Sequence, residues 1–223
     1  MNLTCRELIH DLLADPIKFH NEGHANALLQ TFFDGEPVEI LRPLLHCRVS
    51  LVQHAVIFVA SELGKRATPL IGDVIPLMYL GDRYVRFHAT EILAVCAVAE
   101  HSHEFAHVVQ MLDSQDEVLR RLAMFLMSRV DIAQLAAARC RLAECGPRSE
   151  VHVQGLCTLE SGSRASSEMI KSMIISDDAV VRRYGAIAAH RLARDLPELV
   201  KTVLSSDDPD LREFSIQATE FVE

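Results

Sequence analysis

Aromatic residues and lysine are scarce in this sequence. Its 223 residues include no Trp, aromatics make up 5%, and only four lysines occur. The formal net charge is −9. Proteins that bind nucleic acid need clustered Lys and Arg to contact phosphates. The composition therefore argues against a nucleic-acid partner and favours a protein partner, with a basic protein preferred.

The sequence also lacks signals for membrane insertion, secretion and disulfide formation. No apolar run has the length of a membrane-spanning helix. Residues 1–16 are amphipathic and do not contain the apolar core of a signal peptide. None of the six cysteines forms a C-x-x-C pair, and we expect most of them, Cys140 and Cys145 included, to pack as small apolar residues. These features favour a reduced, cytoplasmic protein without membrane contact.

The usual sequence motifs of enzymes are missing, with one exception. The sequence has no Gly-rich phosphate loop and no G-x-S-x-G elbow, and nothing assembles a Ser-His-Asp triad. We therefore expect no enzyme activity, no catalytic residue and no cofactor.

The exception is HEFAH at residues 103–107, which has the spacing of the HExxH zinc-protease signature. The apolar positions of this segment are Phe105, Val108, Val109 and Leu112, and His103 and His107 fall on the opposite side of a helical wheel. We expect both imidazoles to face solvent, outside any cleft. They are a weak surface candidate for metal only, and we expect no catalytic zinc.

The feature that is present is a repeated Asp-x-x-x-Arg pair. It occurs as Asp82/Arg86, Asp116/Arg120, Asp178/Arg182 and Asp208/Arg212. Two weaker copies centre on Val52 and His152, so the series 52, 86, 120, 152, 182, 212 has steps of 34, 34, 32, 30 and 30 residues. A fixed period in this range is typical of stacked helical repeats.

Each pair has a local structural explanation. The Asp follows turn residues and precedes an apolar stripe, so it should cap a helix. The Arg lies one turn later and should pair with that Asp, forming part of a seam between repeats. Both members change together in the weaker copies, which have Arg48 with Val52 and Arg148 with His152. A small residue follows three positions after each Arg position, as at Gly155 and Gly185.

The pattern between the pairs is helix, turn, helix. Residues 68–80 and 84–99 form one expected hairpin, and an Ala-rich helix is expected over 132–145. Helices at about 3–14 and 23–33 should cap the N-terminal end. The sequence predicts an all-α protein, a right-handed αα-superhelix of five to six helical hairpins in one domain. Residues 1–35 are the cap and residues 36–223 the repeats, which are degenerate around 131–167.

The pattern Asp-x-x-Val-Arg-x-x-Ala resembles HEAT-like repeats. The first half is also similar to the HEAT-like immunity proteins of bacterial polymorphic-toxin systems, through LQTFFDGEP at 29–37, LRPLL at 41–45, ASELG at 60–64 and YVRF at 84–87. This similarity covers residues 28–96. It implies a non-enzymatic cytoplasmic antitoxin that binds one cognate toxin domain, and it transfers no contact residues.

Second helices often line the concave side of such a solenoid, so Glu62 and Glu91 are our candidate partner-binding residues. Other functions stay open. One is a HEAT-like scaffold or a chaperone of the lyase-subunit type. A lesser one is a HEAT-like DNA glycosylase or a zinc hydrolase. The oligomeric state is not predicted.

Overall fold

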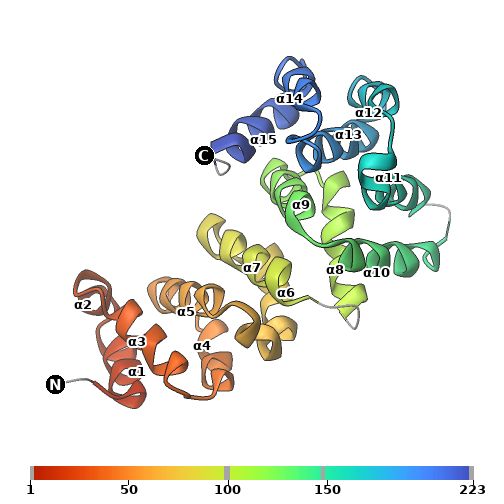
Figure 1. Cartoon of the computed structure of the whole chain (residues 1–223). Helices are drawn as coiled ribbons and strands as arrows, with labels where there is room; N and C mark the ends of the chain where they lie inside the picture. The colour runs from red at the N-terminus through yellow and green to blue at the C-terminus, as the bar shows by residue number, and fades with distance from the viewer. Residues whose placement is uncertain (1–2, 98–100, 147–148, 221–223) are drawn as a thin grey trace. The chain divides into compact units, whose positions relative to one another are not determined.

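The computed structural model describes residues 3–97, 101–146 and 149–220, and their side chains as far as residue 216 (Figure 1). Helices and turns make up these ranges and no β-strand occurs in them, so the predicted all-α class is confirmed. The chain divides into two compact units, residues 1–97 and 98–223.

Over residues 3–97, the first unit contains six α-helices longer than one turn, a one-turn helix and two 3-10 segments. They are α1 (Cys5–Ala14), α2 (Pro16–Asn21), α3 (His24–Phe33), η1 (Val38–Leu41), α4 (Arg42–Leu45), α5 (Ser50–Glu62), η2 (Gly64–Leu70), α6 (Ile71–Leu80) and α7 (Arg83–Cys96). Neighbouring helices pack in order, α1 on α3, α3 on α5 and α5 on α7, with α6 against α7.

Two boundaries in the first unit differ from the prediction. A short helix, α2, follows α1 because Asp15 accepts a hydrogen bond from the Lys18 amide and Pro16 occupies the first helical position. The expected helix over 68–80 begins as the 3-10 segment η2, which contains Pro69, and is α-helical from Ile71. The last two residues of the expected helix 84–99 lie outside the described residues.

The second unit contains eight α-helices and two short 3-10 segments in its described part. They are α8 (Ser102–Gln110), η4 (Met111–Asp113), α9 (Glu117–Arg129), α10 (Ile132–Ala143), α11 (Glu150–Ser161), η6 (Gly162–Arg164), α12 (Ser167–Ile174), α13 (Ala179–Arg191), α14 (Pro197–Leu204) and α15 (Pro209–Glu220).

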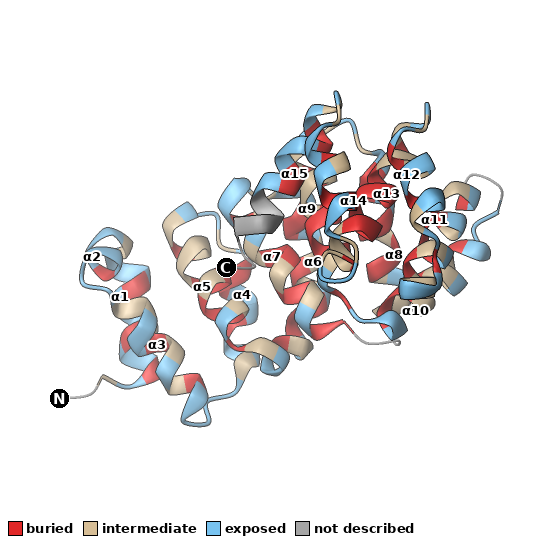
Figure 2. Cartoon of the chain, turned by 45° about the horizontal axis from the view of Figure 1, so that its top comes forward, coloured by how far each residue is buried: buried red, intermediate tan, exposed pale blue. Residues whose placement is uncertain are grey.

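Helix α13 is the centre of the second unit. It contacts α9, α11, α12, α14 and α15. The stretch from Arg183 to Ala189 is buried without interruption, and buried residues gather where α9 and α13 lie (Figure 2). Its small residues, Gly185 and the alanines around Ile187, let the neighbouring helices approach on several sides.

The packing of the second unit is not limited to consecutive hairpins. Helix α9 contacts α13 and α15, which lie far along the chain. Helix α10 packs on α8, and α11 packs on α13. The α10–α11 hairpin is the degenerate copy, where the position expected to carry Asp is Arg148. Arg120 of α9, a member of the repeated pairs, instead forms its ion pair with Asp210 of α15.

The aspartates cap their helices as the sequence indicates. Asp82 accepts a hydrogen bond from the Val85 amide at 3.0 Å, and Asp178 accepts one from the Val180 amide at 2.7 Å. The same arrangement occurs at the two other pairs, where Asp116 accepts from the Val118 amide and Asp208 from the Asp210 amide. These bonds satisfy amides at helix N-termini that have no partner within the helix.

The small positions after each Arg are places of close helix contact. A Cβ atom at Gly155 would collide with the ring of Tyr184, and a Cβ at Gly185 would lie 2.7 Å from the Ile174 amide nitrogen. The corresponding Ala89 and Ala123 are fully buried. The sequence pattern therefore marks helix contacts, because any larger side chain would push two helices apart.

No helix in the described part of the chain combines the length and the apolar character that crossing a membrane requires.

A half-buried histidine, His190, makes the stability of the second unit depend on pH. Nε2 of His190 lies 2.8 Å from Oγ of Ser215, and burial lowers the pKa of His190 from 6.5 to about 4. The unfolded chain therefore takes up this proton first as the pH falls. The stability that the neutral imidazole contributes is complete above pH 6.5 and is lost as the pH falls from there toward 4.

We expect this loss to approach about 1.4 kcal/mol per pH unit for His190 alone. Urea unfolding of the wild type and of His190→Gln at pH 7, 6 and 5 measures it. Burial also lowers the pKa of His88 and His152, so the variant isolates one of three contributions. The variant should lose less stability on acidification than the wild type. Parallel curves would show that His190 does not titrate in this range.

Candidate protein-binding surface

Aromatic and imidazole rings gather on helices α5 and α7 of the first unit. We call these residues the ring surface: His54, Phe58, Tyr84, Phe87 and His88. Phe58 follows His54 by four residues on α5, and Phe87 and His88 follow Tyr84 by three and four residues on α7, so each set lies on one side of its helix. Helices α5 and α7 pack against each other, so the two faces join.

The rings contact one another across the two helices. The centroid of Tyr84 lies 4.8 Å from that of His54 and 4.4 Å from that of His88. The rings of Phe58 and Phe87 meet His88 edge to face, at 5.9 Å and 5.3 Å. Rings at these separations stabilise each other's orientation. Even so, Tyr84 remains 42% exposed and Phe87 38% exposed.

Hydrogen bonds fix His88 at the centre of this surface. The hydroxyl of Ser61 donates to the Phe58 carbonyl at 2.8 Å, and Nδ1 of His88 lies 2.9 Å from the same hydroxyl oxygen. Because the hydroxyl hydrogen is already used, the imidazole is the donor to Ser61. Burial, and secondarily the charge of His54, lowers the pKa of His88. Because this imidazole nitrogen donates to Ser61, it cannot accept the hydroxyl proton, and the Ser61 hydroxyl is not activated as a nucleophile.

A second serine and histidine pair, Ser50 and His54, lies in the first turns of α5, next to the N-cap residue Asp82 of α7. Nε2 of His54 is 2.6 Å from Oδ2 of Asp82 and 3.4 Å from Oγ of Ser50. A catalytic triad needs the serine on one imidazole nitrogen and the carboxylate on the other. Here Ser50 and Asp82 both contact Nε2 of His54, so the three residues do not have the arrangement of a catalytic triad.

The two predicted partner-binding glutamates lie on the helices that bear the ring surface. Glu62 is exposed at the end of α5, and Glu91 is partly exposed on α7, one turn beyond Phe87 and His88. Burial, followed by the charge of Glu62, raises the pKa of Tyr84. The sequence pattern indicated these two carboxylates but not the rings on the same two helices. The i,i+4 pairs His54/Phe58 and Tyr84/His88 are the signal that could have found them.

The expected pairing of Asp with Arg on one helix is wrong for Asp178/Arg182 and Asp208/Arg212. Arg182 donates to Asp208 at 2.9 and 3.1 Å and to the carbonyls of Ser176 and Asp177. Arg212 donates to the Ser206 carbonyl at 2.7 Å. Each arginine thus turns back onto the loop before its own helix, and Arg182 also binds the acid of the next repeat.

The expected side-chain pair of Asp82 with Arg86 is also wrong. The Asp82 carboxylate caps α7 by accepting from the Val85 amide at 3.0 Å, and it lies 2.6 Å from Nε2 of His54. Burial raises the pKa of Asp82, but these two groups outweigh it and lower that pKa. Arg86 meets Asp82 through the backbone instead, where its amide donates to the Asp82 carbonyl at 2.9 Å. The physical reason is that the cap and His54 already occupy the carboxylate.

Arg120 follows the same rule with a more distant acid. It donates to the carbonyls of Ser114 and Gln115, and its Nε lies 2.5 Å from Oδ2 of Asp210. Arg183, at 3.6 Å, contacts the same carboxylate oxygen. Arg120 of α9 and Arg183 of α13 therefore both bind the Asp210 carboxylate of α15. This contact holds the three helices together, which is a structural role.

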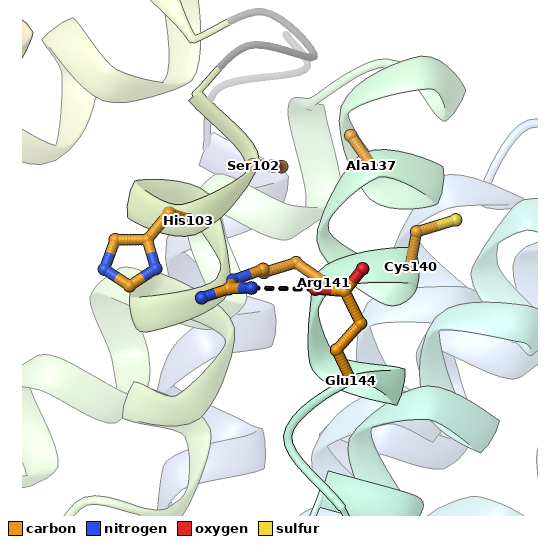
Figure 3. A pocket seen from close by; sticks show the side chains of 6 residues that line it. All are labelled: Ser102, His103, Ala137, Cys140, Arg141 and Glu144. Atoms are coloured by element: carbon orange, nitrogen blue, oxygen red, sulfur yellow. Dashed lines mark hydrogen bonds and ion pairs between the residues drawn. The ribbon is translucent and has the colours of Figure 1, made fainter.

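The HExxH segment lies on α8, at the edge of an open hollow between α8 and α10 (Figure 3). Phe105, Val108 and Val109 are buried, whereas His103 is exposed and His107 is partly exposed, as the helical wheel predicts. The expectation that both imidazoles lie outside any cleft is wrong for His103, which lines the hollow because α10 packs beside α8. The Nε2 atoms of the two histidines are 3.3 Å apart. The described part of the chain contains no group of three or more His, Cys, Asp or Glu residues that could hold a metal ion.

The prediction that the cysteines of the Ala-rich helix fill the core is wrong. Cys140 and Cys145 are exposed, as is Cys157, while Cys5 and Cys96 are buried. The buried side of α10 is formed by Leu135, Ala138 and Leu142. In such an Ala-rich helix the apolar face cannot be read from residue type, because alanine and cysteine occur on both sides.

Comparison with known proteins identifies no family. No family model matches the chain, and no curated protein matches it. Among solved structures, the crystal structure of an engineered protein superposes with a TM-score of 0.49 and 16% sequence identity, covering 97% of this chain and 67% of that chain. A likeness at this level says nothing about function.

Proposed function

We propose that this chain is a non-enzymatic protein-binding module, and that the ring surface binds a basic segment of its partner. The observation that carries the proposal is a set of five rings, held by contacts across two helices, with Tyr84 and Phe87 exposed. Exposed aromatic residues on a rigid support are typical centres of protein interfaces.

The charge around the rings favours a basic partner segment. Helix α5 contains no Lys or Arg, and Glu62 stands at its end. On α7, Asp82 and Glu91 lie near the two ends of the ring positions and Arg83 and Arg86 lie between them, so with Glu62 the acidic groups around the rings outnumber the basic ones by three to two. An Arg or Lys side chain placed over an exposed ring gains about 0.5–2 kcal/mol from the cation–π interaction. The net charge of −9 would also speed association with a basic partner.

The finer assignment rests on the family resemblance. We propose that the helical hairpins are HEAT-like repeats stacked in a right-handed superhelix, and that the chain is a cytoplasmic immunity protein. The residues that resemble such proteins, 28–96, include both helices of the ring surface. The partner is then a toxin domain, and neutralisation consists of binding it.

Co-expression with the product of the adjacent gene tests this function. The expected result is a stable complex and rescue of growth from the toxic partner. A complex without any toxicity to relieve would favour the scaffold or chaperone alternative. Absence of both complex and rescue would refute the immunity assignment.

The variant Tyr84→Ala tests the ring surface itself. We expect it to weaken partner binding by about 2 kcal/mol, roughly 30-fold, because Tyr84 contacts two other rings and offers an exposed face. Titration calorimetry with the purified partner measures this change.

The matched control is Tyr79→Ala. Tyr79 is 44% exposed, like Tyr84, but lies on α6 outside the ring surface. Its replacement should leave affinity unchanged, and thermal unfolding should show that both variants stay folded. Equal losses in the two variants, or no loss in Tyr84→Ala, would place the interface elsewhere.

A further inference from the structure

A hollow of ≈ 820 Å³ opens in the second unit between the turn before α13 and the turn before α15. The C-terminal parts of α12 and α14 and the N-terminal halves of α9, α13 and α15 line it. We call it the acidic hollow; its exposed lining includes Ile175, Asp177 and Asp207. We propose that it binds a basic protein segment in which an apolar residue neighbours Lys or Arg. It is a separate site from the ring surface, which belongs to the first unit.

Two turns of the same sequence, Ser-Asp-Asp, bring carboxylates to this hollow. They are residues 176–178 and 206–208. In each turn the serine hydroxyl accepts a hydrogen bond from the amide of the second aspartate at 3.2 Å, and that aspartate caps the helix that follows. The first aspartate, Asp177 or Asp207, has no such role. It is exposed, and its carboxylate has no hydrogen-bond or ion-pair partner among the described residues.

The turn before α9 shows that the middle residue need not be acidic. This turn reads Ser-Gln-Asp and has Gln115 in the middle. It forms the same bonds, since the Asp116 amide donates to the Ser114 hydroxyl at 3.1 Å and Asp116 accepts from the Val118 amide at 2.8 Å. Folding therefore accounts for the serine and the last aspartate of such a turn, but not for Asp177 and Asp207. Because these two carboxylates line one hollow, we attribute them to contact with a ligand.

The lining as a whole favours a cationic ligand. It contains five acidic and three basic side chains, which gives a net charge of −2. The arginines are already bound within the protein. Arg182 pairs with Asp208, Arg120 pairs with Asp210, and both arginines also donate to backbone carbonyls. Arg183 contacts Asp210 too and is 8% exposed. The charge left for a ligand is therefore that of the exposed acids.

An exposed aliphatic side chain lies beside these acids. Ile175 is 75% exposed, whereas Ile174 before it is buried, and the exposed Pro209 lines the hollow from the other turn. An apolar side chain that covers Ile175 would remove this surface from water, which favours binding. Carboxylates and aliphatic surface within one hollow complement a segment in which basic and apolar residues are neighbours.

NMR titration of the full chain with the peptide acetyl-KLKKLK-amide tests the site. Tyr84→Ala is the background, so the ring surface does not contribute and the result does not depend on its function. We expect saturable binding, with amide shifts concentrated at residues 175–177 and 206–208. Replacing both Asp177→Asn and Asp207→Asn should weaken binding about fivefold, since one exposed ion pair contributes roughly twofold. Ile175→Ser should weaken it about tenfold by removing the apolar contact.

Two matched controls change exposed residues of the same unit outside the hollow. Asp195→Asn removes an exposed carboxylate, and Met169→Ser removes a side chain that is 40% exposed. Both should bind the peptide as the background does, and circular dichroism should show unchanged helix content in every variant. Absence of binding, equal weakening by the controls, or equally strong binding of acetyl-ELEELE-amide would overturn the proposal. A dimer of the chain that Ile175→Ser abolishes in ultracentrifugation would also overturn it, because the occupant would then be a second copy.

Discussion

Replacing Asp210 with alanine should lower the free energy of unfolding by about 3–5 kcal/mol. Asp210 is 6% exposed, and its carboxylate lies between two arginines, with Oδ2 2.5 Å from Nε of Arg120 and 3.6 Å from Nη2 of Arg183. Without it, two largely buried guanidinium groups of the same charge face each other. The loss comes from uncompensated buried charge more than from the hydrogen bond itself.

The electrostatics of Arg183 support this expectation. Burial, followed by the charge of Arg120, lowers the pKa of Arg183, and Asp210 acts in the opposite direction. Arg183 also donates to the Leu112 carbonyl and is 8% exposed, so it cannot move into solvent without breaking that contact. The negative charge of Asp210 therefore offsets the repulsion between Arg120 and Arg183 where α9, α13 and α15 pack together.

Urea unfolding of Asp210→Ala against Asp207→Ala measures the effect. Asp207 lines the same surface hollow as Asp210 but is exposed, so its replacement should change stability by no more than about 0.5 kcal/mol. If the two variants lost the same amount, the buried Arg120–Asp210–Arg183 cluster would not be the source of stability.

The second large effect concerns the contact between α11 and α13. Tyr184→Ala should lower the free energy of unfolding by about 3–5 kcal/mol, because Tyr184 has no exposed surface and its removal leaves a cavity. Its hydroxyl lies 3.2 Å from Nδ1 of the buried His152, so a hydrogen bond is lost as well. Gly155→Ala should cost about 1–3 kcal/mol by overpacking, since the added methyl would collide with the Tyr184 ring.

A double-mutant cycle distinguishes this contact from a general weakness of the helices. In the Tyr184→Ala background the ring is gone, so Gly155→Ala should cost much less than it does alone. Gly72→Ala is the control, because a Cβ atom there meets nothing within 4 Å. It should be neutral or stabilise slightly, since alanine is the better helix former. Strict additivity of Gly155→Ala and Tyr184→Ala would mean that the two residues do not contact each other.

Much of the local structure could be predicted from the sequence, because it depends on residues close together in the chain. The caps at Asp82 and Asp178 join groups two or three residues apart. The outward position of His103 and His107 follows from the apolar residues between and after them. The small residues Gly155 and Gly185 recur in the sequence at a fixed distance from the repeated position, and the structure shows that both are close helix contacts.

The sequence by itself thus determined the helical class and the capping of the helices. Only the tertiary structure decided which charges pair and which rings meet. Arg182 binds Asp208 and Arg120 binds Asp210, across 26 and 90 residues, in place of the carboxylate one turn away. The physical reason is that each nearby aspartate accepts backbone amides at its helix end, while the long arginine side chain reaches the helix packed beside it. His54 and Tyr84 likewise become neighbours only when α5 and α7 pack, and no local pattern specifies that contact.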